Sequence, residues 1–370
     1  MSDRTRIAVI GGGMIAQTVY LPTLAALTDR FETVALADPS ATVRDALAAR
    51  RPGLRTHADW RALVDGERLD ALVVGSPNGT HVDVVLAALD AGLHVLVEKP
   101  LAIDPADAAA IAARAEEAGR VVQVGYQKRY DAGYAALLDA LPDSTEQLRL
   151  IDVVTYDPWM ARRPFAARDL VVGRDVPREL LRAGAEREHE QVAAALGCEV
   201  EPAAVRAFVD VFLGALVHDV NLVHGVLERL GVTLPLHVAS AGAWADGKAA
   251  NAVFRLPAAD GGAAWQCAWV LLEGLEEFRE TVSFHFRDAI HRLTFSSPYL
   301  REHATVHEVI GAADGAEQAR RSARILDNYR AELEHFHDCI VAGETCRTPP
   351  AQALIDLLAL RDAFRAAAVG

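Results

Sequence analysis

The chain has 370 residues, 51% of them hydrophobic, and a formal net charge of −14. This length predicts two domains, each able to bury a core, and the apolar content excludes a disordered chain. The acidic balance, with no basic stripe to offset it, argues against a nucleic-acid partner. We expect neither a membrane span nor a secretion leader, since no apolar run approaches ~20 residues and no charged-then-apolar segment precedes the first strand. Four cysteines without a CxxC pair indicate reduced thiols and a cytoplasmic protein.

A glycine-rich turn follows the first expected strand, residues 7–10, and leads into a helix-compatible segment, residues 17–27. Gly11, Gly13 and Ala16 fit the pattern G-x-G-x-x-G/A of a dinucleotide-binding βαβ unit. In that pattern the first glycine permits a tight turn, and the second lets the backbone approach a pyrophosphate. A small third residue lets the helix pack closely on the strand. The helix N-terminus then offers unpaired N–H groups to the phosphates.

Asp38 ends the second expected strand, residues 31–38. A carboxylate about 20 residues beyond the glycines accepts hydrogen bonds from the adenosine ribose and would repel a 2′-phosphate, so we expect NAD as the cofactor. Arg44 lies near enough in the sequence to keep NADP possible. The alternative is that Asp38 is an ordinary strand-end acid in an Asp-Pro turn.

Strand and helix patterns continue to alternate up to residue 125. Short apolar strands are expected at 69–75, 93–97 and 121–124, and helices at 82–91 and 105–118. Such strands form a parallel sheet covered on both faces, and its ligands collect at the carboxyl ends of the strands. Polar segments occupy five strand ends of this kind: Gly11–Gly13, Asp38, Ser76–Asn78, Glu98–Pro100 and Gly125–Arg129.

Beyond residue 125 the strands cluster instead of alternating with helices. The expected elements are a strand at 148–156, a charge-dense segment at 161–197, a helix at 205–230, strand runs at 236–243, 251–256, 264–272 and 280–295, and helices at 326–342 and 350–368. This arrangement predicts an α+β domain with a mostly antiparallel sheet. We therefore divide the α/β chain into a doubly wound Rossmann domain, residues 1–125, and a second domain, residues 126–370, whose last helices can pack back on the first.

Five motifs occur in order along the chain: the glycine turn, Ser76-Pro77-Asn78 with His81, Glu98-Lys99-Pro100, the segment from Gly125 through Tyr126, Gln127, Lys128 and Arg129 to Tyr130, and His218-Asp219. Together they resemble the Gfo/Idh/MocA family, which contains glucose–fructose oxidoreductase and inositol dehydrogenase. The resemblance covers essentially the whole chain. It implies a Rossmann domain, a C-terminal open-faced sheet for substrate binding and oligomerisation, and pyridine-nucleotide chemistry on sugars or cyclitols.

The resemblance also suggests roles for individual residues. It implies that Pro77 and Asn78 border the nicotinamide ribose and that Lys99 reaches the substrate. The full set of expected cofactor-binding residues is Gly11, Gly13, Met14, Ile15, Asp38, Ser76, Pro77, Asn78, His81, Glu98, Lys99 and Gln127.

Hydride transfer at an alcohol carbon requires an acid or base at the oxygen and a donor that stabilises developing alkoxide charge. Lys99, at a strand end, is the candidate cation, and His218 is the candidate base; the alternatives are a surface lysine and a core histidine. Many members of the family carry an aspartate one turn before this histidine, where this chain has Gly214. Asp210, a further turn back, could replace it only if the helix bends or shifts register.

The expected substrate-binding residues are Lys99, Tyr126, Arg129, Trp159, His218 and Asn221. Asn221 shares the helix face of His218 and could bind a hydroxyl, whereas Tyr126 and Arg129 could equally pack at the domain junction. We expect no metal site. The charged segment at 161–197 is predicted either to cover the substrate pocket or to be a surface insertion.

The sequence therefore predicts an NAD(P)-dependent oxidoreductase acting on a hydroxyl or keto carbon of a sugar, cyclitol or related polyol. Two alternatives stay open: a redox-neutral enzyme that oxidises a carbon transiently, and a non-catalytic dinucleotide- or sugar-binding regulator. We expect a homodimer or homotetramer formed through the second sheet, because apolar side chains at successive positions of 265–272 could make both faces of that sheet apolar.

Overall fold

The computed structural model describes residues 4–158, 170–244, 247–257, 262–275, 278–297, 300, 303–313 and 316–369. These residues form two compact units. The described part of the first unit comprises 4–126, 170–198 and 329–354, and the second unit comprises the rest. No helix among the described residues combines the length and the apolar character that crossing a membrane requires.

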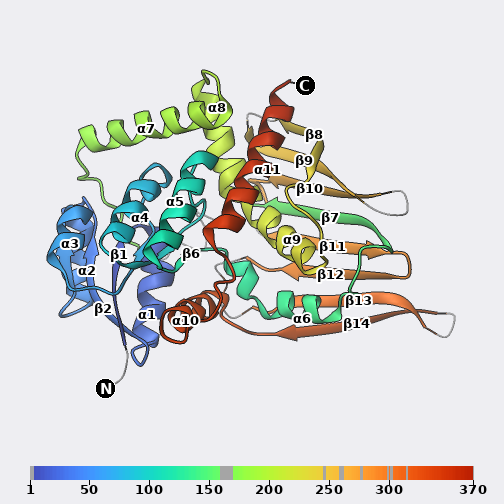
Figure 1. Cartoon of the computed structure of the whole chain (residues 1–370), viewed down its shortest axis with the longest axis horizontal. Helices are drawn as coiled ribbons and strands as arrows, with labels where there is room; N and C mark the ends of the chain where they lie inside the picture. The colour runs from blue at the N-terminus through green and yellow to red at the C-terminus, as the bar shows by residue number, and fades with distance from the viewer. Residues whose placement is uncertain are drawn as a thin grey trace. The chain divides into compact units, whose positions relative to one another are not determined.

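The first unit is built on a six-stranded parallel sheet (Figure 1). Its strands are β1 (Thr5–Ile10), β2 (Phe31–Ala37), β3 (Arg55–His57), β4 (Ala71–Val74), β5 (His94–Val97) and β6 (Val122–Val124). The order β3-β2-β1-β4-β5-β6, with every pairing parallel, is that of the doubly wound dinucleotide-binding fold. The predicted Rossmann sheet is therefore confirmed. Its direction of winding reverses between β1 and β4, where such folds bind ligands.

Helices surround this sheet, and their ends follow local sequence signals. They are η1 (Ala16–Tyr20), α1 (Leu21–Ala26), α2 (Ala41–Arg50), α3 (Trp60–Gly66), η2 (Asn78–Thr80), α4 (His81–Asp90), α5 (Pro105–Ala118), α7 (Arg178–Leu196) and α10 (Asn328–Val341), the last from residue 329 on. Asp104 caps α5 by accepting from the Ala106 amide at 3.0 Å, and Gly119 ends it at a φ of 61°. Leu333 and Phe336 of α10 join the buried core beneath the sheet.

The second unit contains an eight-stranded sheet. Its strands are β7 (Leu148–Asp157), β8 (His237–Trp244), β9 (Ala249–Leu256), β10 (Ala263–Leu271), β11 (Arg279–Phe286), β12 (Ala289–Phe295), β13 (Thr305–Ala313) and β14 (Ala316–Arg324). In the order β14-β13-β12-β11-β7-β10-β9-β8, only β7 and β10 pair in parallel. The predicted, mostly antiparallel sheet is confirmed. The expected run at 280–295 divides into β11 and β12, and the hairpin β13–β14 was not anticipated.

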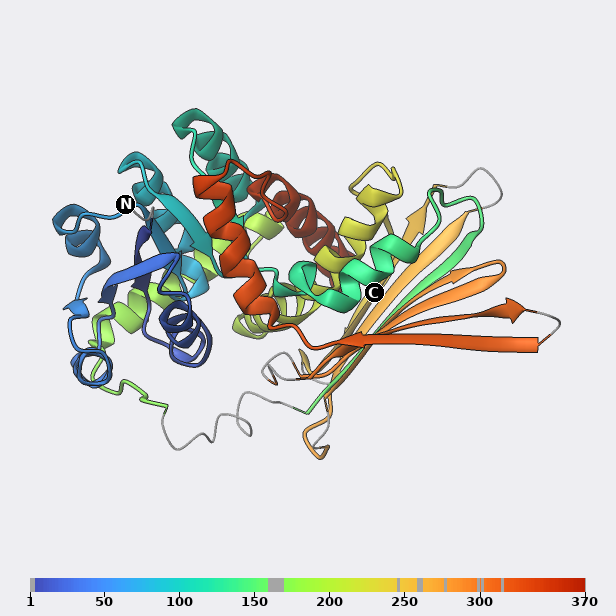
Figure 2. The same cartoon turned by 90° about the horizontal axis from the view of Figure 1, so that it is seen from below.

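Helices of the second unit lie over one face of its sheet (Figure 2). They are η3 (Gln127–Tyr130), α6 (Ala132–Ala140), α8 (Pro202–Arg206), η5 (Ala207–Leu216), α9 (Val217–Arg229) and α11 (Pro350–Val369), the last from residue 355 on. Along β10, Trp265, Cys267 and Trp269 are buried, whereas Gln266 between them is exposed. Trp265 stacks on Phe254 with ring centroids 4.3 Å apart. The strand therefore alternates between a packed face and a second face, on which Ala264, Ala268 and Val270 are half-buried and Gln266 is the polar exception.

Candidate functional site

The glycine turn of the first unit has the geometry of a phosphate-binding loop. Gly11 has a φ of 92°, and a Cβ there would lie 2.6 Å from the carbonyl oxygen of Gly75, so the position requires glycine. A Cβ added at Gly13 would meet no atom of the described residues within 4 Å, so the backbone is open on that side. The Gln17 amide donates to Gly13 O at 3.0 Å, and the buried Ala16 packs against the sheet. The loop thus leads an accessible backbone into a helix N-terminus.

Asp38 follows β2 and lies beside this loop. Its Oδ2 accepts a hydrogen bond from the Gly12 amide at 2.8 Å, and its Oδ1 accepts one from the Ser40 amide at 2.8 Å. Arg44 donates through Nη1 to the carbonyl oxygens of Asp38 at 2.7 Å and Pro39 at 3.0 Å. The carboxylate is therefore held in place, and the nearby guanidinium hydrogen-bonds to backbone carbonyls.

A buried histidine connects the ends of β4 and β5. His81 Nδ1 lies 2.8 Å from Pro100 O, and its Nε2 lies 2.9 Å from Ser76 O. Burial lowers the pKa of His81, and a neutral ring donates to only one of these two carbonyls. Ser76 Oγ and Thr80 Oγ1 are 2.7 Å apart, so the turn containing Pro77–Asn78 is fixed at both sides. His81 therefore supports the shape of this turn.

Glu98 and Lys99 stand at the carboxyl end of β5. Glu98 accepts a hydrogen bond from Tyr20 Oη at 2.6 Å and one from the Lys99 amide at 3.2 Å. Burial raises the pKa of Glu98.

Glu332 of α10 is fully buried, and neither of its carboxylate oxygens has a hydrogen-bond partner among the described residues. Burial, and then the charge of Glu98, raise the pKa of Glu332 well above its ordinary value.

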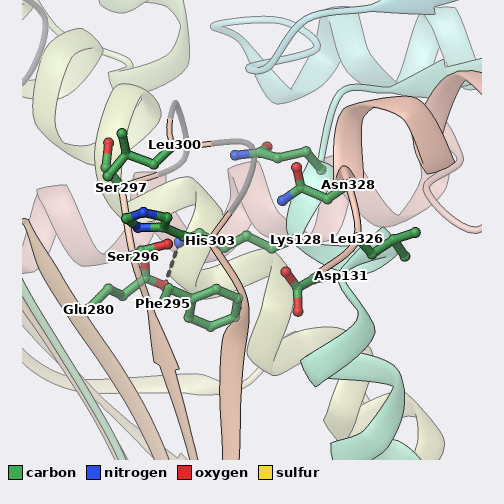
Figure 3. A pocket seen from close by; sticks show the side chains of 11 residues that line it. Lys128, Asp131, Glu280, Phe295, Ser296, Ser297, Leu300, His303, Leu326 and Asn328 are labelled. Atoms are coloured by element: carbon green, nitrogen blue, oxygen red, sulfur yellow. Dashed lines mark hydrogen bonds and ion pairs between the residues drawn. The ribbon is translucent and has the colours of Figure 1, made fainter. Parts of the chain in front are cut away.

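The second unit contains a buried charge cluster that three separate elements bring together. Figure 3 shows two of its members, Lys128 and Glu280. Lys128 Nζ of η3 lies 3.1 Å from Asp219 Oδ1 of α9 and 2.5 Å from Glu280 Oε1 of β11. Thr155 of β7 donates to Asp219 Oδ2 at 3.2 Å. Burial alone would lower the pKa of Lys128, but the charges of Glu280 and Asp219 outweigh it and raise that pKa. Burial raises the pKa of Glu280. Lys128 acts in the opposite direction, but the charge of Asp219 adds to the rise, because one ammonium balances only one of the two carboxylates.

A small hollow lies beside this cluster. It is lined by Gln127, Lys128, Asp131, Glu280, Phe295, Ser296, Ser297, Leu300, His303, Leu326 and Asn328 (Figure 3). Asp131 caps α6 by accepting from the Gly133 amide at 2.7 Å, and it also accepts from Thr305 Oγ1 at 2.7 Å. The hollow therefore offers both polar and apolar side chains near buried charges.

His218 is the second residue of α9 and is half-buried. The preceding ten residues, η5, wind as a π-helix, whose i→i+5 hydrogen bonds shift the register of side chains relative to an α-helix. The faces of Asp210 and Gly214 relative to His218 therefore do not follow the α-helical spacing assumed from the sequence. A Cβ at Gly214 would lie 3.0 Å from Val209 O, so the winding leaves little room for a larger residue.

Asn221 and Arg129 take part in contacts inside the second unit. Asn221 donates through Nδ2 to Asp356 Oδ2 at 2.8 Å, and His224 Nδ1 lies 2.6 Å from Asp356 Oδ1. Arg129 donates to Asn221 O at 3.3 Å, and its guanidinium lies 5.5 Å from the centre of the Tyr134 ring. These contacts tie α9 to α11 and give Asn221 a structural partner that the sequence did not reveal.

The remaining expected residues are placed as follows. Met14 and Ile15 are half-buried at the start of the first helix, Tyr126 is buried, and Gln127 lines the hollow. Trp159 lies outside the described residues. Within the part of the chain that the structure describes, no group of three or more His, Cys, Asp or Glu side chains is arranged to hold a metal ion.

Sequence reasoning missed Lys128, Asp219, Glu280 and Asp356 as site or support residues. Asp219 had a signal, since it directly follows His218 in a recognised motif. Glu280 had a weaker one, because it is the one acid of the alternating stretch 280–286. Asp356 had a similar one, because it is a single acid within the apolar stretch 353–360.

Residues 5–126 match the model of an oxidoreductase family with an NAD-binding Rossmann fold, Gfo/Idh/MocA. The inositol 2-dehydrogenase 3 of Saccharopolyspora erythraea is 40% identical over 130 residues, which are 35% of this chain and 38% of that protein. The inositol 2-dehydrogenase of Paracoccus denitrificans is 35% identical over 189 residues, 48% of this chain and 54% of that protein. The chain thus spans from about a third to about half of the length of these relatives.

Solved structures share the fold over nearly the whole chain. A UDP-N-acetylglucosamine 3-dehydrogenase from Acidithiobacillus ferrooxidans has a TM-score of 0.71 at 20% identity and covers 98% of both chains. A 3-ketoreductase from Actinomadura kijaniata, solved with NADP and TDP-benzene, has a TM-score of 0.72 at 19% identity and covers 99% of this chain and 98% of its own. Residues 5–126, which carry the glycine loop and Asp38, are thus similar to the Gfo/Idh/MocA family of oxidoreductases, and the solved structures show that the fold is shared over the rest of the chain.

Proposed function

We propose that this chain is an NAD-dependent oxidoreductase that transfers a hydride between the nicotinamide and a hydroxyl or keto carbon of a sugar, cyclitol or related polyol. The observation that carries the proposal is the loop at Gly11–Gly13, open at Gly13 and joined to the carboxylate of Asp38 through the Gly12 amide. Relatives named inositol 2-dehydrogenase support the substrate class.

The residues of the first unit fit a dinucleotide. The amides after Gly13, including those of Met14 and Ile15, would face the pyrophosphate, and Asp38 would accept hydrogen bonds from the adenosine ribose. The turn at Ser76–Asn78, which His81 supports, would border the nicotinamide side. NAD is favoured over NADP because Asp38 would repel a 2′-phosphate. When bound, the cofactor supplies the acceptor or donor of the hydride.

Lys99 and His218 are the proposed catalytic residues. The Lys99 ammonium would stabilise negative charge on the reacting oxygen, and His218 would take up or return its proton. The Lys99 amide donates to Glu98, which Tyr20 also binds, so the backbone that carries the lysine is fixed. The proposed mechanism uses His218 without an aspartate one helical turn earlier, because this chain has Gly214 at that position.

The test is to incubate the purified chain with NAD and a panel of inositols, sugars and other polyols while following the absorbance of the reduced nicotinamide. K99A should lower turnover by on the order of 10²-fold or more, whereas K248A, at an exposed lysine paired with Glu273, should not. H218A should lower turnover with NAD binding retained, and H237A, at an exposed histidine, is its control.

Three results would contradict parts of this proposal. Failure to bind either NAD or NADP would remove the dinucleotide function. Near-normal turnover of both K99A and H218A would remove the catalytic assignment. Tight NAD binding without turnover of any polyol or sugar would favour the regulator instead.

A further inference from the structure

An extended segment of the first unit, residues 170–175, lies against the edge of its sheet that carries the glycine loop. The Val171 amide donates to Gln17 Oε1 at 3.0 Å, and Gln17 Nε2 donates back to Val171 O at 2.9 Å. The same Nε2 donates to Gly12 O at 2.7 Å. One glutamine therefore anchors this segment directly to the proposed phosphate-binding loop.

The far end of the segment reaches the N-terminus of α2. Asp175 Oδ1 accepts a hydrogen bond from Ser40 Oγ, and its Oδ2 accepts one from the Thr42 amide at 3.0 Å. These hydrogen bonds, that from Ser40 first, lower the pKa of Asp175 to about 2, so the carboxylate is ionised at neutral pH. A Cβ at Gly173 would collide with Ser40 Oγ, so the close approach depends on glycine.

The donors that Asp175 uses stand next to the expected position of the adenosine ribose. The Ser40 amide donates to Asp38 Oδ1 at 2.8 Å, so a single residue contacts both carboxylates. A helix N-terminus with a serine hydroxyl is well suited to hold a phosphate, but here the Thr42 amide and the Ser40 hydroxyl already bind a carboxylate. Arg44, four residues after Ser40, donates to backbone carbonyls instead.

We propose that Asp175 is a second determinant of cofactor choice. Its carboxylate occupies the place at the N-terminus of α2 that the 2′-phosphate of NADP would need, and it adds a second negative charge beside Asp38. NAD, which carries a hydroxyl at that position, avoids both the occupied donors and the charge repulsion. The inference rests on the proposed dinucleotide function and extends it to a residue far from the glycine loop in the sequence.

Calorimetric titration of the full chain with NAD and with NADP tests this proposal. D175N and D175A should each tighten NADP binding by about tenfold or more, because a phosphate with nearly two negative charges loses one repulsive neighbour. NAD binding should change by less than about threefold, because no like charge faces its hydroxyl. D59N is the matched control, since Asp59 also caps a helix, accepting from the Arg61 amide at 3.0 Å, and the charge change is the same.

The outcomes separate this inference from the proposed function. If the unaltered chain binds neither dinucleotide, the proposed function fails. If it binds NAD and both Asp175 variants leave the ratio of NAD to NADP affinity unchanged, the function stands and the role of Asp175 is refuted. Equal weakening of both cofactors would also refute it, because Asp175 would then only anchor the segment.

Discussion

Replacing Lys128 by methionine removes the one ammonium that lies between Asp219 and Glu280. The three side chains are buried, with nitrogen–oxygen distances of 3.1 and 2.5 Å, and Asp219 and Glu280 are exposed by only 2% and 1%. Methionine nearly preserves the volume, so the main loss is the charge. Removing one partner of a buried ion pair costs about 3–5 kcal/mol, because the remaining charge is uncompensated. We expect the free energy of unfolding to fall by that amount, measured by urea denaturation with fluorescence and circular dichroism.

Glu280 provides the internal control for this experiment. Burial raises the pKa of Glu280, so the folded state holds a proton that the unfolded state releases, and this contribution to stability is lost as the pH rises above the ordinary glutamate range. E280Q should therefore cost less than K128M, and the double variant K128M/E280Q should recover part of the loss. The deficit of K128M should shrink toward low pH, because carboxyl groups that take up a proton there no longer need the lysine as a counter-charge. A loss below about 1 kcal/mol in K128M at neutral pH, or no recovery in the double variant, would refute this reasoning, since a buried pair predicts more.

Three further outcomes follow from the structure. G11A should destabilise the first unit by about 1–3 kcal/mol, because alanine would need a positive φ and would collide with Gly75. G13A should fold normally and lose NAD affinity. Thermal unfolding measures the stability of both variants and calorimetry their NAD affinity, and equal losses of stability would contradict the prediction. E332Q should flatten the decline in the free energy of unfolding above the ordinary glutamate pKa. With the raised pKa of Glu332, the folded state keeps a proton that the unfolded state releases as the pH rises, and this favours unfolding. An unchanged pH profile in urea unfolding would argue against this. Light scattering at micromolar concentration should return a dimer or tetramer, and a monomer near 39.8 kDa would oppose the expected assembly.

Local signals were sufficient for the glycine loop and for five of the six strands of the parallel sheet. The apolar runs of β1, β2, β4, β5 and β6 are mostly buried, so each reads as a strand by itself, and their alternation with helices leaves few possible topologies. The short strand β3 (Arg55–His57) was not expected, because its residues are polar and exposed or half-buried. Gly11 and Gly13 are recognisable because a turn of this kind imposes backbone requirements that few residues satisfy. Asp38 is likewise marked by its place at a strand end.

Hairpins and irregular helices were less predictable. The boundary between β11 and β12 has no strong turn signal in the apolar run 280–295, and β14 is rich in charge, so neither element has a distinctive pattern. The π-helical winding of η5 arises from how the segment packs in the second unit, and an α-helical period read from the sequence could not show it.

The sequence by itself determined the alternation of apolar strands and helices in the first unit, the glycine loop and the strand-end acid, because these depend on residues close together along the chain. Only the tertiary structure decided which charges are buried and paired. Lys128 and Glu280 are 152 residues apart, and Ser40 and Asp175 are 135 residues apart. In the sequence each is an ordinary polar residue that could equally face solvent. The partner of each, and the burial of Lys128 and Glu280, exist only once distant segments fold together. That is why a charge cluster and a carboxylate at a helix N-terminus had no local signature.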